Sequence, residues 1–109
     1  MQIRERDLKI LQAIFSRFAS VRRVLLFGSR ATDTARRASD IDLAVIAPEM
    51  SPSEWAELAE QVEESPIIYR IDLVRLDTLP DGTLREYILR EGLPIYQNEI
   101  LGCAPNDTA

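Results

Sequence analysis

The sequence predicts an α/β or α+β fold, in which a β-sheet has helices packed against it. Three features of the chain indicate this class: apolar residues at helical spacing, short runs rich in β-branched residues between them, and Gly or Pro residues where these segments end. The 109 residues are 46% hydrophobic and 28% charged, which suits one globular domain. We expect that domain over residues 1–96 and a flexible tail over residues 97–109.

The first part of the chain predicts a helix and a strand. An apolar stripe predicts an amphipathic helix over residues 5–19, and its members, at spacings of 3, 4 and 3, are Leu8, Leu11, Phe15 and Phe18. The wholly apolar residues 24–27 predict a strand, because a short apolar run bounded by a turn signal is typical of a buried strand. Gly28 and Ser29 end it.

The middle of the chain predicts a loop, a second strand and a second helix. Residues 30–39 are polar and rich in arginine, which indicates a short helical turn and a loop. Residues 41–46 predict a strand that Pro48 ends. Residues 51–54, Ser-Pro-Ser-Glu, form a capping box with proline at the first helical position, so we expect a helix from here to about Glu64.

The last part predicts a strand, a helix and a brief final strand. Residues 67–74, which follow Pro66, are rich in β-branched residues and predict the third strand. A last helix is marked by Leu84, Ile88 and Glu91 and is closed by Gly92 as its C-terminal cap. Residues 93–96 predict the final strand.

Composition and charge exclude several classes of function. The sequence has no histidine, which excludes Ser-His-Asp and Cys-His catalysis, acid–base catalysis by histidine and zinc bound by histidine. The net charge of −5 disfavours a broad nucleic-acid surface, so we expect no direct nucleic-acid binding. No apolar run approaches about 18 residues, the first residues are charged and Cys103 is the only cysteine. We therefore expect a cytoplasmic protein without a membrane span or secretory signal.

Three aspartates form the candidate chemical site. Asp40 and Asp42 stand two residues apart at the start of a predicted strand, so alternation places both side chains on one face of the sheet. Such a pair repels itself unless a cation lies between the carboxylates. Asp72 stands in the middle of an otherwise apolar strand, which is unfavourable for an aspartate. Each acid alone is compatible with a solvated or ion-paired position, but together they are the hard oxygen ligands that Mg²⁺ prefers.

A glycine and a serine precede the paired aspartates. Glycine lets backbone amides approach a phosphate, and the hydroxyl of Ser29 adds a donor. Gly28-Ser29, ten further residues and Asp40-Ile41-Asp42 form a pattern that resembles the G-S-x10-D-x-D signature of the nucleotidyltransferase β superfamily. The resemblance covers residues 8–96 and is similar to the minimal nucleotidyltransferase (MNT) subgroup in four segments, residues 26–31, 39–45, 71–74 and 90–96.

This resemblance implies the nucleotidyltransferase fold, a small mixed β-sheet flanked by helices, and a role for each site residue. Gly28 and Ser29 are expected to hold the β- and γ-phosphates of ATP, the substrate. Arg30, which follows this pair as an arginine frequently does in the family, is expected to assist. The expected ligands of two Mg²⁺ ions, which are also the expected catalytic residues, are Asp40, Asp42 and Asp72. Asp72 also activates the attacking hydroxyl in this scheme.

The resemblance further implies a partner and a reaction. Stand-alone MNT proteins are similar to the antitoxins of HEPN–MNT toxin–antitoxin pairs, whose partner is a helical HEPN ribonuclease. The implied activity is transfer of AMP from ATP to a tyrosine hydroxyl of that toxin, which inactivates it. Two alternatives stay open: an antitoxin that blocks its partner by binding without catalysis, and a nucleotidyltransferase for a small molecule such as an aminoglycoside, whose acceptor site another subunit completes.

Overall fold

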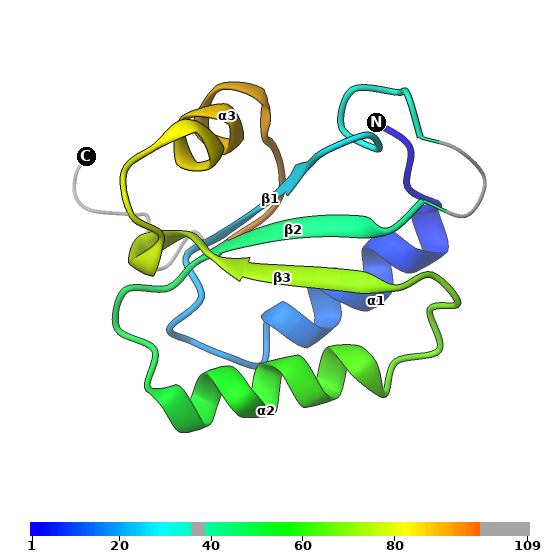
Figure 1. Ribbon diagram of the computed structural model, residues 1–109. Helices are drawn as coiled ribbons and strands as arrows, with labels where there is room; N and C mark the ends of the chain where they lie inside the picture. Colours follow the sequence, from blue (N-terminus) through cyan, green and yellow to red (C-terminus); the bar gives the residue numbers. More distant parts are fainter. Residues whose placement is uncertain (36–38, 99–109) are drawn as a thin grey trace, which may run out of the picture.

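Four strands form one mixed sheet with helices on both faces (Figure 1), as the sequence predicts. The computed structural model describes residues 1–35 and 39–98. The elements are α1 (Glu5–Phe15), β1 (Arg23–Phe27), β2 (Ile41–Ile46), α2 (Pro52–Glu63), β3 (Ile71–Arg75), the 3-10 turn η1 (Leu76–Thr78), α3 (Thr83–Glu91) and β4 (Leu93–Gln97). Within the described ranges, no helix is long and apolar enough to cross a bilayer.

The strand order is β3-β2-β1-β4. β1 pairs with β2 and with β4 in antiparallel fashion, whereas β2 and β3 are parallel. A parallel pair needs a crossover connection, and α2 supplies it. The predicted capping box starts that helix: the Ser51 hydroxyl accepts from the Glu54 N–H at 3.1 Å, and the Glu54 carboxylate accepts from the Ser51 N–H at 2.9 Å.

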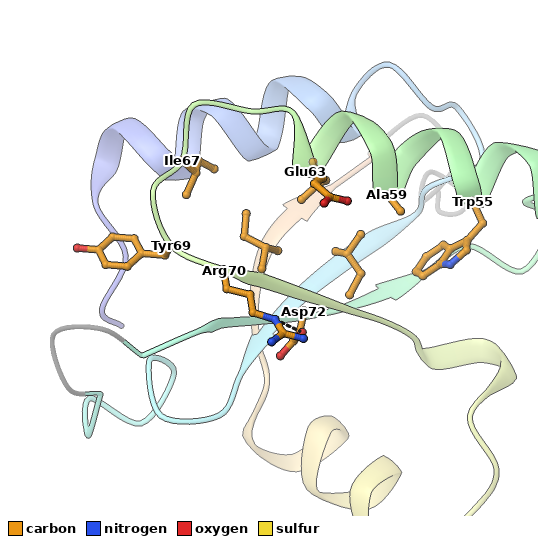
Figure 2. Close-up of a pocket in the computed structure, with 10 residues that line it drawn as sticks. Trp55, Ala59, Glu63, Ile67, Tyr69, Arg70 and Asp72 are labelled. Carbon is orange, nitrogen blue, oxygen red and sulfur yellow. Dashed lines mark ion pairs between the residues drawn. The ribbon is translucent and has the colours of Figure 1, made fainter.

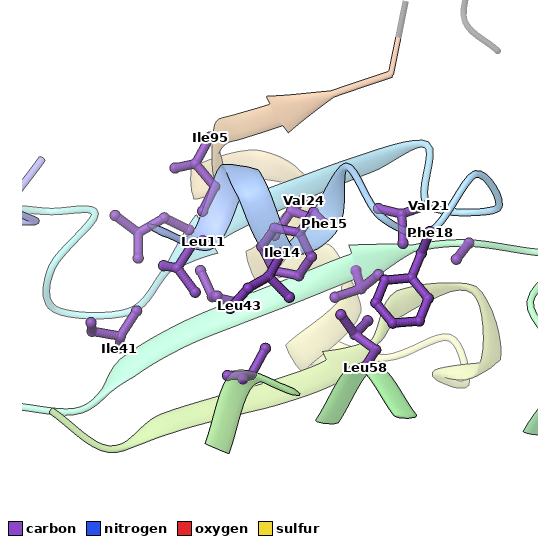
Figure 3. Close-up of a cluster of buried hydrophobic side chains, with 14 of the residues drawn as sticks. Leu11, Ile14, Phe15, Phe18, Val21, Val24, Ile41, Leu43, Leu58 and Ile95 are labelled. Carbon is purple, nitrogen blue, oxygen red and sulfur yellow. The ribbon is translucent and has the colours of Figure 1, made fainter. Parts of the chain in front are cut away.

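The hydrophobic residues divide between the two faces of the sheet. The larger cluster fills the space between the sheet and helices α1 and α2 (Figure 3), with Leu11, Phe15, Leu43 and Leu58 fully buried. The smaller cluster lies under α3 on the other face and consists of Leu25, Phe27, Ala44, Leu76 and Ile88. Because α3 is short, this second face carries less apolar cover, and polar side chains of the strands have access to solvent there.

Two predicted boundaries are wrong. The first helix ends at Phe15 rather than at residue 19, because the Phe18 N–H bonds to the Phe15 carbonyl in a turn that still buries Phe18 in the core. The third strand begins at Ile71 rather than at residue 67, since β2, its partner, begins only at Ile41. The exposed Ile68, with 74% of its surface accessible, belongs to the connection before the strand.

The C-terminal residues also differ from the predictions, whereas the segment between β1 and β2 begins with a turn as predicted. Residues 29–33 form successive turns, in which the Ala31 and Thr32 N–H groups bond the Gly28 carbonyl, and residues 36–38 of the predicted loop lie outside the described residues. Gly92 is the cap of α3, as predicted, but its φ of −67° is open to any residue. It is small because a Cβ there would lie 2.5 Å from the Ile88 carbonyl oxygen. Gln97 belongs to β4 rather than to a tail, and the rest of the predicted tail lies outside the described residues after Asn98.

Candidate functional site

The strand register brings two of the three aspartates together. Asp42 on β2 and Asp72 on β3 are direct partners in the parallel ladder. Each stands two residues before a member of the apolar cluster under α3, Ala44 and Val74 respectively, so both carboxylates point to that face of the sheet. Both side chains are partly exposed. Asp40 precedes β2 by one residue and completes the acidic group at this end of the strands.

Gly28 lies directly against Asp42. Its φ of 80° is the left-handed conformation that favours glycine, and it ends β1 opposite the start of β2. A Cβ at Gly28 would lie 2.5 Å from Asp42 Oδ2, so the carboxylate would have to move from its present position. The glycine therefore serves both the turn and the close approach, and it sets the Gly-Ser pair beside the carboxylates.

Ser29 lies within the turns that follow Gly28. The Thr34 N–H donates to the Ser29 carbonyl at 2.9 Å, and the Ala31 N–H donates to the Gly28 carbonyl at 3.1 Å. In the described part of the chain, the Ser29 hydroxyl makes no hydrogen bond to protein, so it is available to an oxygen of a ligand. The geometry suits the predicted contact with phosphate, and the contact itself stays a prediction.

The site has an excess of negative charge. Burial raises the pKa of Asp42 above its ordinary value, and the nearby carboxylates of Asp72 and Asp40 raise it further, whereas Arg30 lowers it. An acid whose pKa is raised in this way is destabilised in its charged form. A cation bound among these carboxylates would relieve that cost.

Arg30 is placed differently from what the sequence suggested. Its guanidinium is buried, with 7% of the residue exposed, and donates to the Ser39 carbonyl at 2.7 and 3.1 Å, to the Asp40 carbonyl at 3.3 Å and to the Gln2 carbonyl at 2.9 Å. It also lies over the ring of Tyr69, 4.3 Å from the centroid. These contacts make Arg30 a residue that positions the backbone of the D-x-D segment, and the expected assistance to the nucleotide stays untested.

Sequence reasoning missed two residues beside the site. Tyr69 supports the buried Arg30 with its ring. Arg70 forms an ion pair with Asp72, with 3.4 Å between Nε and Oδ1 (Figure 2). The Arg70 side chain is 76% exposed and that of Asp72 42%, so this pair is easily exchanged for another cation. The period-2 spacing of Arg70 and Asp72 was a signal for their pairing, but nothing local indicated the place of Tyr69.

The donor set fits Mg²⁺, whereas the present arrangement of the side chains does not yet form its site. Across the described residues, no three acidic, histidine or cysteine side chains are close enough together to hold a metal ion. The carboxylates of Asp40, Asp42 and Asp72 are nevertheless the hard oxygen donors that Mg²⁺ takes. The crowding that raises the pKa of Asp42 is the physical mark of such a site.

The chain matches a known family over most of its length. The model of the family described as "Polymerase beta, Nucleotidyltransferase" matches residues 9–100. A protein of Haemophilus influenzae named "Probable protein adenylyltransferase MntA" is 30% identical over 102 residues, which cover 91% of this chain and 87% of that protein.

Solved structures show the same fold. One, described as a toxin–antitoxin crystal structure with AMP-PNP, has a TM-score of 0.66 and 25% identity and covers 90% of this chain and 77% of its own. Another is the complex of a tri-AMPylated Shewanella oneidensis HEPN toxin with an MNT antitoxin, with a TM-score of 0.65 over 92% of this chain and 77% of its own. At 20% identity, that second likeness shows the fold alone.

Proposed function

The chain belongs to the polymerase-beta nucleotidyltransferase family, and from this membership we propose that it is the antitoxin of a toxin–antitoxin pair, which transfers AMP from ATP to a tyrosine hydroxyl of a HEPN ribonuclease toxin and so inactivates it. The observation that carries the proposal is the meeting of Gly28, Asp42 and Asp72 at one end of the sheet. ATP is the donor, and the reaction belongs in the cytoplasm, where ATP is available.

The comparisons support a protein acceptor. The relative from Haemophilus influenzae is named as a protein adenylyltransferase, and the alignment covers most of both chains. The structure with AMP-PNP is a toxin–antitoxin complex that matches 90% of this chain. Nothing in the described residues favours a small-molecule acceptor to the same degree.

The proposed reaction is an in-line displacement at the α-phosphorus of ATP. The tyrosyl oxygen forms the new P–O bond, the bond to the β,γ-pyrophosphate breaks, and pyrophosphate leaves with the electron pair. Asp72 accepts the proton of the tyrosine hydroxyl, which is needed because a phenol with a pKa near 10 is about one part in a thousand ionised at pH 7.

Positioning and charge supply the remaining catalysis. The turn at Gly28 and the free Ser29 hydroxyl hold the phosphates that leave as pyrophosphate. Asp40, Asp42 and Asp72 would hold magnesium, which when bound lowers the cost of charge on the attacking and departing oxygens. Arg30 fixes the backbone of Asp40 so that the first carboxylate starts the strand in a constant position.

The test is a comparison of Asp72→Asn with the exposed control Asp81→Asn, each expressed with the toxin. We expect Asp72→Asn to bind ATP within about tenfold of the unmodified protein while transfer falls at least 10²-fold. The intact mass of the toxin reports the adenylyl group, and growth reports neutralisation. Full growth rescue by Asp72→Asn without added mass would establish binding-only neutralisation and reject the enzymatic proposal.

A further inference from the structure

The outer edge of β3 offers unpaired backbone groups. β3 is at one end of the strand order, so β2 is its only neighbour in the described sheet. The Arg70 carbonyl accepts from the Ile41 N–H of β2 at 2.8 Å. In a parallel pair, residues that bond the neighbouring strand alternate with residues whose N–H and C=O point the other way. The backbone groups of Ile71 and Leu73 therefore point outward, as a template for another strand.

A groove runs along this edge, between β3 and α2 (Figure 2), with a volume of about 610 Å³. We call it the β3–α2 groove. Trp55 and Tyr69 lie at its opposite ends. Ile71 and Leu73, which present their backbone groups at the edge, also line the groove and are only half-buried. Asp72 borders the groove from β3, with its carboxylate directed to the opposite face of the strand, so the groove lies beside the proposed catalytic site.

The α2 side of the groove is acidic, whereas arginines stack on the aromatic residues at its two ends, Arg4 and Arg30 on Tyr69 and Arg75 on Trp55. No basic residue occurs between Asp40 and Glu64, and α2 carries the exposed residues Glu57, Glu60 and Glu63. Glu63 lines the groove itself. Arg70 is the one cation in the lining that the structure describes, and Asp72 neutralises it. This charge favours a basic occupant and opposes a second copy of the chain, whose α2 would bring the same acidic face.

We propose that the β3–α2 groove is the acceptor site, and that it binds an extended, basic-flanked segment of the protein substrate as an added strand on the edge of β3. This inference rests on the proposed function and names how its substrate is held. Main-chain hydrogen bonds to Ile71 and Leu73 give the segment its place, and alternate side chains enter the groove. Glu63 on the α2 side attracts a basic flank.

Strand alternation explains why the acceptor is a tyrosine. A residue of the added strand opposite Asp72 has its side chain on the face that carries Asp72 and Asp42, while its two neighbours point into the groove. Neighbouring strands lie about 4.8 Å apart. A tyrosine is long enough to bring its hydroxyl across that spacing to the carboxylates, whereas a serine or threonine hydroxyl stays above its own strand. The groove thus selects both the segment and the acceptor residue.

The probe for this site is a synthetic peptide of eleven residues. It has tyrosine at the centre, valine one and three residues away on both sides, threonine two residues away, and two lysines at each end. Binding is measured without ATP by fluorescence anisotropy, and AMP transfer by the intact mass of the peptide with ATP and Mg²⁺. Further peptides replace the tyrosine with serine, replace the lysines with glutamates, or carry N-methyl groups on the valines or on the tyrosine and threonines.

Two variants of α2 form a matched pair. Ala59 lines the groove, whereas Ala56 is exposed on the same helix outside it. Ala59→Arg fills the groove, and Ala56→Arg adds the same charge elsewhere. We expect Ala59→Arg to weaken peptide binding at least tenfold and Ala56→Arg to change it less than twofold. One N-methyl set should abolish binding and the other leave it, because only alternate residues of an added strand bond inward. The serine peptide should bind but accept no AMP.

The possible results separate this inference from the proposed function. Three results would overturn the proposal that the groove is the acceptor site. They are failure of the lysine-flanked peptide to bind, equal binding of this peptide to Ala59→Arg and Ala56→Arg, and equal effects of both N-methyl sets. Equal adenylylation of the toxin by the two variants would overturn it too, while the proposed function stands. Binding in the expected pattern without AMP transfer from ATP to peptide or toxin would support the groove and reject the proposed chemistry. Transfer to the serine peptide would overturn the account of tyrosine selection.

Discussion

The charged side chains at the two ends of the parallel strands β2 and β3 differ in how they are paired. At the C-terminal end, Arg75 pairs with Asp77 at 3.2 Å and donates to the carbonyls of Ala47 and Met50, and Asp77 also accepts from the Ala47 N–H at 2.8 Å. Both charged side chains are less than one-fifth exposed, and every charge there has a partner.

The N-terminal end of the same strands leaves its charges crowded. Burial raises the pKa of Asp42, and the neighbouring carboxylates of Asp72 and Asp40 raise it further. Arg30 lowers this pKa through its charge but directs its hydrogen bonds to carbonyls rather than to that acid. At this end Arg70 forms only an exposed ion pair with Asp72, and within the described residues no ion pair reaches Asp42. The comparison shows that the two ends have different tasks: the paired end stabilises the fold, and the crowded end is held for a ligand.

The largest effect should come from neutralising the crowded end. We expect Asp42→Asn to abolish AMP transfer, because it removes a proposed magnesium ligand beside the phosphates. Transfer to the toxin, followed by intact mass, is the measurement, and Asp81→Asn is the control because Asp81 is fully exposed away from the sheet. Transfer above about a tenth of the unmodified rate would show that this carboxylate is not needed for catalysis. It would also reject the view that the N-terminal end of the strands is a ligand site.

The paired end should respond in stability rather than in activity. Arg75→Met removes the partner of a half-buried aspartate and of two carbonyls, so we expect the free energy of unfolding to fall by about 2–4 kcal/mol. The exposed pair of Arg22 and Glu49 gives the control, since Arg22→Met should cost less than about 1 kcal/mol. Urea unfolding of the three proteins measures both values. A loss no larger than that of Arg22→Met would show that pairing does not stabilise this end.

A smaller effect is expected at the phosphate-binding turn. Ser29→Ala removes a hydroxyl that makes no hydrogen bond to the described residues, so stability should stay nearly unchanged. Its proposed contact with a charged phosphate oxygen is worth roughly 1.5–3 kcal/mol, and we expect ATP with Mg²⁺ to bind about tenfold or more weakly. Titration calorimetry measures this affinity, with Ser53→Ala on the exposed side of α2 as control. An unchanged dissociation constant would reduce the Gly-Ser pair to a turn.

The smallest effect concerns the pH dependence of stability. The pKa of Asp42 is higher in the folded protein than in the unfolded chain, so its charged form costs stability at pH values above the folded pKa. Without metal, Asp42→Asn should therefore unfold at an equal or higher temperature than the unmodified protein at pH 7. The difference should vanish as the pH falls below the unfolded pKa, where the acid is protonated in both states. A lower melting temperature of Asp42→Asn than of the unmodified protein at pH 7 would contradict the claim that the charged form of Asp42 destabilises the fold.

The local pattern of the sequence predicted the element types well. The capping box at Ser51 placed the start of α2, and the apolar runs placed β1 and β2 within one residue of their observed bounds. The first helix and third strand were predicted too long, because an apolar residue such as Phe18 is buried equally well by a turn. The 3-10 turn η1 was not expected, since three residues carry too little periodicity to be recognised.

The sequence by itself predicted the residues of the candidate site and the strand on which Asp42 stands, because the spacing of side chains along a strand is a local property of the backbone. Only the tertiary structure decided that Asp72 lies opposite Asp42, that Arg30 binds carbonyls over the ring of Tyr69, and that β3 is an edge strand beside an acidic helix. These features arise from contacts between residues far apart in the chain. The register of the strands, the burial of side chains and the repulsion between carboxylates arise only when the folded chain brings those residues into contact.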